Sequence, residues 1–244
     1  MNQWESDAIC LNATKYGEND AILEVFCRQI GRTKAYVYGG ASKRKRALLE
    51  PCQKLHLAWT TRQEGQLGYF ERLEPIGSIA PIFSDNAALC ALGSISALLH
   101  HAIPEQQKYE SLFDATSVLI DLLGSSNDWP AAYIAWEVGL LQHTGFGLDL
   151  SQCALTNSTD NLAWISPKTG RAATYEAGLP FADKLLALPK FLLDPDAQIN
   201  KGDIADGFAL CGWFIERDLL RQNFQTMPEA RARLIYALGR KNLL

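Results

Sequence analysis

The sequence predicts an α+β protein in which a five-stranded OB-type β-barrel precedes an α-helical domain. The hydrophobic pattern has the short period of strands up to about residue 75 and a helical period from Pro81 onward. Turn residues separate the N-terminal apolar runs at short intervals. The balance of charge changes at about the same position. Residues 1–80 are slightly basic, with 11 of the 23 Lys and Arg residues but only 9 of the 27 Asp and Glu residues, and the rest of the chain is acidic.

The N-terminal part contains five segments with the composition of strands. Gly-containing turns separate them, including the cluster at 16–20 and the turn near Gly65. Closing so small a sheet into a barrel removes its edge strands, which favours an OB-type barrel. An SH3-like barrel is the alternative. The predicted strands cover 8–11, 21–28, 33–38, 54–59 and 67–73.

The remainder of the chain predicts helices around one irregular segment. Asp85 is a candidate N-cap for the first helix, and Asp128 with Pro130 in the first turn opens the third. We therefore expect two domains, 1–80 and 81–244, the second with an irregular insertion at about 146–180. The predicted helices cover 85–101, 108–123, 128–145, 181–188, 203–222 and 228–239.

Residues 43–46 form a run of four basic residues in a protein whose formal net charge is −4. The run follows the small-residue turn 39–42. A tight cluster of positive charge on an acidic background indicates a site for a polyanion, of which a phosphate backbone is the commonest. The alternatives are a solvated loop or, in a eukaryotic protein, a nuclear-import signal.

The strand before this run presents two different faces, because side chains alternate across a strand. Its small residues suit a narrow barrel interior, whereas the opposite face interleaves cations with tyrosines. That combination holds single-stranded nucleic acid by phosphate attraction and base stacking. The tyrosines could instead pack beneath a helix of the second domain. The predicted DNA-binding residues are Arg32, Lys34, Tyr36, Tyr38, Lys43, Arg44, Lys45 and Arg46.

Several other classes of protein lack their sequence signals here. No apolar stretch reaches the roughly 18 residues of a membrane span, and the N-terminus has no signal-peptide pattern, so we expect a cytoplasmic protein. No Walker loop, His-Glu-x-x-His or Gly-x-Ser-x-Gly motif occurs, so we expect no enzymatic activity, and a hydrolase with a degenerate site is a third, remote class. The six cysteines form no Cys-x-x-Cys pair.

Short motifs in a specific order extend over most of the chain, most densely in 8–75 and 137–153. They are Tyr16-Gly17-Glu18-x-Asp20, Phe26, Gly31-Arg32, Gly39-Gly40-Ala41, Leu49-x-Pro51, Glu71-x-x-Glu74 and Leu140-Leu141-x-x-x-Gly145-Phe146-Gly147-x-x-Leu150. In this order and spacing the chain resembles the RecO family, the bacterial recombination-mediator and DNA-annealing proteins.

The resemblance implies an OB-fold followed by a helical domain, and a protein that binds single- and double-stranded DNA and anneals complementary strands. It further implies help in loading RecA onto DNA coated by single-stranded-DNA-binding protein. The implied partners are RecR and the acidic C-terminal tail of that coating protein, in the bacterial cytoplasm and at the nucleoid during repair. The alternative function is a non-enzymatic OB-fold adaptor that binds RNA or an acidic protein.

The resemblance also implies a site for the coating protein's tail, which is acidic and ends in an aromatic residue. Such a tail needs a hydrophobic pocket with basic residues beside it. The candidate partner-binding residues are Tyr133, Trp136, Arg217, Arg221, Arg231 and Arg233.

Many members of the family carry a four-cysteine zinc site after the third helix, and this chain departs from that pattern. Cys153 matches the first ligand, Thr156 occupies the second position, and the second pair falls near Thr174 and Ala177. One thiolate cannot hold a structural zinc, which takes four ligands. We expect no metal and no cofactor, and a degenerate zinc-finger region held by packing of Leu162, Trp164 and Ile165.

Overall fold

The structure is a computed structural model that describes residues 2–63, 65–126, 128–221 and 225–244. The chain forms two compact units. The first comprises residues 1–125 and 228–234, and the second comprises 126–227 and 235–244. The first two long helices therefore group with the N-terminal strands, whereas the sequence predicts a boundary at about residue 80.

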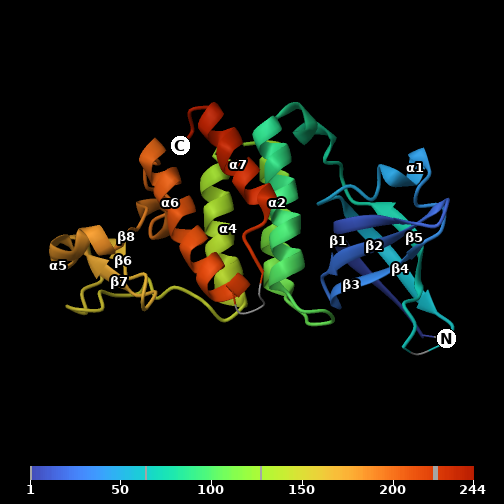
Figure 1. Ribbon diagram of the computed structural model, residues 1–244, viewed down its shortest axis with the longest axis horizontal. Helices are drawn as coiled ribbons and strands as arrows, with labels where there is room; N and C mark the ends of the chain where they lie inside the picture. Colours follow the sequence, from blue (N-terminus) through green and yellow to red (C-terminus); the bar gives the residue numbers. More distant parts are fainter. Residues whose placement is uncertain (1, 64, 127, 222–224) are drawn as a thin grey trace. The chain divides into compact units, whose positions relative to one another are not determined.

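The five predicted strands form a closed barrel in the order β1-β2-β3-β5-β4 (Figure 1). This confirms an N-terminal OB-type barrel followed by helices. The first strand is longer than the predicted run 8–11, because residues 2–9 pair with β4 while residues 8–16 pair with β2. The strands are β1 (Asn2–Tyr16), β2 (Asp20–Cys27), β3 (Gly31–Val37), β4 (Lys54–Thr61) and β5 (Tyr69–Pro75).

The barrel interior follows the two-residue period of its strands. On β3, Ala35 and Val37 are fully buried, as their small size and spacing predict. Leu23 and Val25 on β2, and Leu57 on β4, belong to the same apolar core. The outer face of β3 is therefore the face that carries Arg32, Lys34 and Tyr36.

Two helices of the first unit cover part of the barrel's outer surface. They are α2 (Asn86–Ala102), which follows the 3-10 turn η1 (Ala80–Ser84), and α3 (Glu110–Leu123). Asp85 caps α2 as predicted, accepting hydrogen bonds from the amides of Ala87 and Ala88 at 2.8 and 3.2 Å. Phe26 of β2 packs edge-on against Phe113 of α3, with ring centroids 5.5 Å apart. This contact explains why α3 groups with the barrel.

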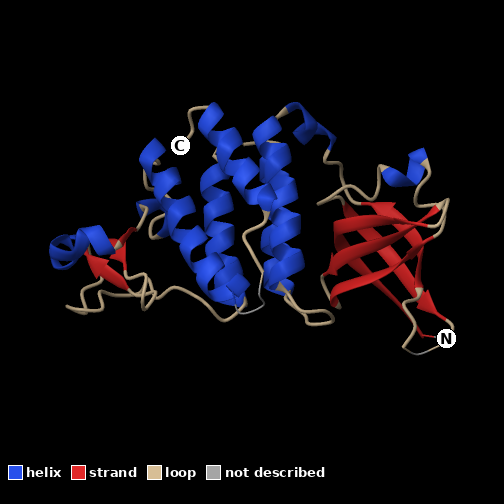
Figure 2. Ribbon diagram, in the orientation of Figure 1, coloured by secondary structure: helices blue, strands red, loops and turns tan. Residues whose placement is uncertain are grey.

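The second unit contains helices and a small sheet in the order β7-β6-β8 (Figure 2). The insertion at 146–180 is thus partly regular, and the prediction of a helix over 181–188 is wrong, because a 3-10 turn and the strand β8 occupy it. The elements are α4 (Trp129–His143), β6 (Leu162–Ile165), β7 (Ala172–Thr174), α5 (Tyr175–Gly178), η2 (Leu179–Lys184), β8 (Leu186–Ala187), η3 (Lys190–Leu192), α6 (Lys201–Phe214) and the π-helical η4 (Ile215–Leu220).

The last helix, α7 (Glu229–Arg240), contributes its first turns to the first unit and the rest to the second. Within the described residues, no helix combines the length and the apolar character that a membrane crossing requires.

Gly31 offers a test of how the start of β3 is held. Its φ is +87°, and an added Cβ would lie 2.0 Å from the carbonyl oxygen of Gln107. Gly17 also has a positive φ, +61°, but a Cβ there would meet nothing within 4 Å. We predict that Gly31→Ala lowers the free energy of unfolding by clearly more than the roughly 1–2 kcal/mol expected for Gly17→Ala from backbone strain alone.

Urea unfolding followed by circular dichroism measures both changes. Equal losses for Gly31→Ala and Gly17→Ala would contradict the close approach of residue 107 to β3.

Candidate nucleic-acid interface

The basic run forms a single helical turn, α1 (Lys43–Arg46), where the sequence suggests a loop. Ser42 begins this turn: its hydroxyl accepts a hydrogen bond from the Lys45 amide at 3.4 Å and donates to the Gly39 carbonyl at 2.7 Å. Lys43, Arg44 and Arg46 are exposed. The Lys45 ammonium donates to the Tyr38 carbonyl at 2.7 Å, which ties the turn to the end of β3.

The outer face of β3 divides into two halves with different surroundings. Its first half lies against the segment that joins α2 to α3. The Arg32 carbonyl accepts a hydrogen bond from the Gln106 amide at 2.8 Å, and the Arg32 guanidinium donates to the Ile103 carbonyl at 2.7 Å. The first half of this face is therefore covered by the protein's own chain.

Arg32 is held within the molecule and is not part of the open interface. Only 15% of its side chain is exposed, and its guanidinium pairs with the carboxylate of Glu24. The other oxygen of Glu24 lies 2.7 Å from Nδ1 of His100. The sequence predicts that Arg32 contacts DNA, but its charge neutralises a buried carboxylate instead. Lys34 is intermediate: it is 48% exposed, and its ammonium lies 3.2 Å from Glu105.

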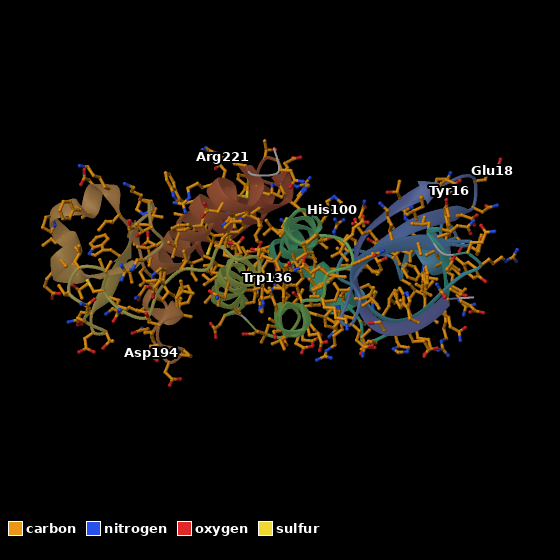
Figure 3. All side chains as sticks on the ribbon, turned by 90° about the horizontal axis from the view of Figure 1, so that it is seen from below. Tyr16, Glu18, His100, Trp136, Asp194 and Arg221 are labelled. Carbon is orange, nitrogen blue, oxygen red and sulfur yellow. The ribbon has the colours of Figure 1, made fainter. Side chains whose placement is uncertain are left out.

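The other end of this face is open: Tyr36 lies near the end of β3, and Tyr38 directly follows the strand. Tyr38 is 57% exposed, and its ring centroid lies 5.4 Å from that of Tyr69 on β5. Tyr36 lies 5.1 Å from Tyr16, measured in the same way. The pKa of the Tyr36 hydroxyl is raised, first by its hydrogen bond with Tyr16. Figure 3 shows Tyr16 at the outer edge of the barrel, beside the turn that carries Glu18.

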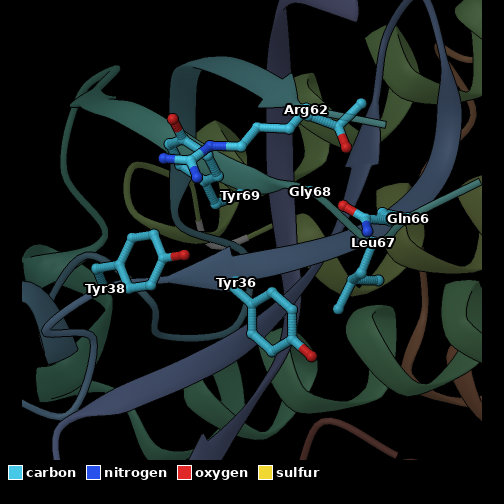
Figure 4. A pocket seen from close by; sticks show the side chains of 8 residues that line it. Tyr36, Tyr38, Arg62, Gln66, Leu67, Gly68 and Tyr69 are labelled. Carbon is cyan, nitrogen blue, oxygen red and sulfur yellow. The ribbon is translucent and has the colours of Figure 1, made fainter. Parts of the chain in front are cut away.

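A hollow of 820 Å³ opens between β3, β5 and the turn that precedes β5 (Figure 4). Tyr36, Tyr38 and Tyr69 line it together with Arg62 and Gln66. Sequence reasoning missed Tyr69, Arg62 and Tyr16. The sequence predicts a strand at 67–73 but not its neighbour in the sheet, and it is the pairing of Tyr69 with Tyr36 that places the Tyr69 ring here.

The cations of residues 2–80 separate into two groups. One group is engaged in ion pairs: Arg28, for example, bonds Asp114 at 2.8 Å and so holds the pKa of that carboxyl below its usual range. The second group forms no ion pair with any residue that the structure describes. The paired cations are Arg28, Arg32, Lys34, Lys54 and Arg72. The second group comprises Lys15, Lys43, Arg44, Lys45, Arg46 and Arg62.

Two cations of the second group lie directly beside the tyrosines. Arg62 shares the hollow with Tyr38 and Tyr69, and Lys45 is bonded to the backbone of Tyr38. A second hollow, of 580 Å³, is lined by Lys15 and Arg46 among others, although Glu18 and Glu50 line it too. We call this surface the tyrosine face: Tyr16, Tyr36, Tyr38 and Tyr69 with Lys15, Lys43, Arg44, Lys45, Arg46 and Arg62.

The predicted partner-binding residues do not form one surface. Tyr133 and Trp136 are buried, at 0% and 4% exposure, and the Tyr133 ring packs 5.6 Å from that of Phe208. They belong to the core of the second unit, so the prediction that they receive a partner is wrong. Arg231 is also buried.

The other three arginines are accessible but engaged in contacts. Arg217 bonds Asp218 at 2.6 Å and donates to the carbonyl of Pro167. Arg221 lies 3.6 Å from Glu216, and Arg233 lies 3.9 Å from Glu229. Figure 3 shows Arg221 at the periphery of the molecule. These arginines therefore offer less free charge than the sequence suggests.

The degenerate zinc-finger region brings together the positions that the family resemblance singles out. The Cys153 sulfur lies 3.9 Å from the Thr174 hydroxyl, which accepts a hydrogen bond from the Ala177 amide at 3.3 Å. Burial opposes the Cys153 thiolate, but hydrogen bonds from the Thr156 hydroxyl and from backbone amides outweigh it and lower the thiol pKa to about 6.

This donor set does not suit zinc, because one thiol, two hydroxyls and a methyl group replace four thiolates. Among the described residues, no group of three or more His, Cys, Asp or Glu side chains is placed to hold a metal ion.

Known proteins match this chain over nearly its whole length. Residues 1–79 match the family model for the N-terminal part of recombination protein O, and residues 84–228 match that for its C-terminal part. The DNA repair protein RecO of Hyphomonas neptunium is 44% identical over 234 residues, which cover 95% of this chain and 96% of that protein. Those of Phenylobacterium zucineum and Caulobacter vibrioides strain NA1000 are 40% and 38% identical, covering 97% and 99% of this chain and 98% and 100% of theirs.

The two cations of β3 differ in role, and substitution separates them. Arg32→Ala leaves the buried Glu24 carboxylate with His100 as its remaining partner, so we predict a loss of about 3 kcal/mol in the free energy of unfolding. Lys34→Ala breaks an exposed pair and should cost less than about 1 kcal/mol. Urea unfolding of both variants measures the difference. Similar small losses would show that Arg32 is not a structural residue.

Proposed function

The chain belongs to the RecO family of DNA repair proteins, and from this premise we propose that it binds DNA through the tyrosine face and anneals complementary strands. The observation that carries the proposal is the separation of cations on the barrel. Those away from the tyrosines are engaged with carboxylates, whereas those beside the tyrosines have no such partner among the described residues. Cations left without carboxylates are available to phosphates.

Annealing requires two polyanions to approach each other. Cations that neutralise the phosphates of one strand lower its repulsion for the second, and the released counterions supply favourable entropy. The tyrosine rings add contacts to exposed bases that do not depend on sequence. We therefore expect binding without base-specific recognition, on single and double strands.

We further propose that the protein assists the loading of RecA onto DNA coated by single-stranded-DNA-binding protein, with RecR and the tail of the coating protein as partners. Family membership supports this part of the proposal. The role is one of binding and positioning, without catalysis of a covalent step. The contribution of Arg217, Arg221 and Arg233 to tail binding stays a prediction.

The basic turn, residues 43–46, should supply much of the salt dependence of DNA binding. If about four to six cations meet phosphates, the logarithm of the affinity for single strands should fall against the logarithm of salt concentration with a slope of roughly −3 to −4. Replacing Lys43, Arg44, Lys45 and Arg46 together by Ala should reduce the slope to roughly −1 and weaken binding at least about tenfold at low salt. Fluorescence anisotropy with labelled oligonucleotides measures both quantities.

A matched control replaces Lys168, Lys184 and Lys190, three exposed lysines of the second unit, by Ala. This control should leave the slope within about 0.5 of the parent value. If the control loses affinity and the basic-turn variant does not, DNA binds the second unit and the proposed site is refuted. In an annealing assay with complementary fluorescent strands, the basic-turn variant should likewise lose activity, and the control variant should retain it.

We propose that the protein folds without zinc, because Thr156, Thr174 and Ala177 provide no thiolate beside Cys153. Elemental analysis of the purified protein should find less than about 0.1 zinc per chain, and chelator treatment should leave the melting temperature unchanged. Stoichiometric zinc would contradict the proposal.

A further inference from the structure

We propose that the hollow lined by Tyr38 and Tyr69 is a binding site for an unpaired nucleobase, and that this site makes the protein bind single strands more tightly than duplex. This inference rests on the proposed function, since it assigns a ligand to one part of the tyrosine face. It separates that face into a base site on β3 and β5 and a phosphate site on α1.

Aromatic rings form three sides of the hollow. Tyr38 and Tyr69 lie 5.4 Å apart at an angle of 55°, and so form two walls that are not stacked on each other. Tyr36 provides the third, and Tyr16 supports it from outside the hollow at 5.1 Å. Rings that are not stacked on one another leave faces on which a base can stack. The volume of 820 Å³ lies in the range of sites that accept organic ligands.

The back of the hollow is fixed by hydrogen bonds. The Tyr36 amide donates to the Gly68 carbonyl at 3.1 Å, and the Trp59 indole donates to the Leu67 carbonyl at 3.1 Å. Gly68 has a φ of +69°, and a Cβ there would lie 2.5 Å from the Trp59 ring. The turn that contains Gly68 therefore packs closely against the barrel, so the hollow is already formed before any ligand binds.

Polar groups at the rim suit a nucleotide. Arg62 is exposed and lines the hollow, and it forms no ion pair with the described residues. In Figure 4 its side chain extends toward the part of the hollow that carries Tyr69. Gln66 adds an amide at the opposite part of the rim. A guanidinium beside aromatic faces can bind the phosphate of the same nucleotide whose base is stacked.

The same geometry discriminates against duplex. In a duplex each base is already stacked between its neighbours, so its faces cannot meet the tyrosines unless the strands open. The exposed cations of α1 meet no such restriction, because phosphates line the outside of both forms. Loss of the base site should therefore weaken single-strand binding alone.

The test uses the full chain and three labelled probes in fluorescence anisotropy: an oligothymidylate, an abasic oligonucleotide of equal length, and a duplex. The parent protein should bind oligothymidylate more tightly than the abasic strand. Tyr69→Leu should weaken oligothymidylate binding roughly 5- to 150-fold and change the other two affinities by less than about 2-fold. Tyr69→Phe keeps the ring and should retain parent affinity.

Tyr236→Leu is the matched control, since Tyr236 is a tyrosine with 68% exposure in the second unit. It should bind all three probes as the parent does. Equal binding of oligothymidylate and abasic strand by the parent would overturn the base site while leaving DNA binding intact. Equal loss of all three affinities in Tyr69→Leu would also overturn it, by showing that the ring only supports the fold. Failure of the parent to bind any probe would overturn the proposed function as well.

Discussion

Closure of the barrel between β3 and β5 is the constraint on which the site depends. The two strands are parallel there, and Tyr36 and Tyr69 form their registered pair. Because these strands are far apart in sequence, only this closure brings Tyr69 and Arg62 beside the tyrosines of β3. The hydrogen bond from the Tyr36 amide to the Gly68 carbonyl holds the preceding turn in the same place. The hollow, its aromatic side chains and the Arg62 guanidinium beside them all follow from one strand pairing.

Carboxylates of α3, of the segment that precedes it and of β2 determine which barrel cations remain available. Acidic residues of α3 pair with Arg28 and Lys54, the latter through Asp121 at 2.7 Å. Glu105, between the two helices α2 and α3, pairs with Lys34, and Glu24 of β2 pairs with Arg32. A protein of net charge −4 can thus expose a locally positive surface, because the acidic residues are placed against the cations that the site does not use. The net charge describes the chain, whereas affinity for a polyanion depends on where the unneutralised cations lie.

Much of this arrangement could be predicted from the sequence, and the failures have physical causes. The two-residue period identified the buried Ala35 and Val37 and the outward face of β3. It could not show that residues 103–107, some 70 positions later, cover Arg32. The alternation of side chains along a strand indicates which residues share a face, but not which other segments pack on that face. Tyr133 and Trp136 were misassigned for a related reason: α4 is apolar on most of its surface, so its pattern does not distinguish a binding face from a core. Tyr69 required knowledge of strand pairing.

The most direct test of the central claim is to locate bound DNA on the protein. A single-stranded oligonucleotide containing photoreactive 5-iododeoxyuridine is crosslinked to the full chain, and the modified peptides are mapped by mass spectrometry. If the tyrosine face binds DNA, crosslinks should concentrate on the peptides that contain Tyr36, Tyr38 and Tyr69, and high salt should abolish them. Crosslinks confined to residues 126–227, with none on the barrel, would contradict the account.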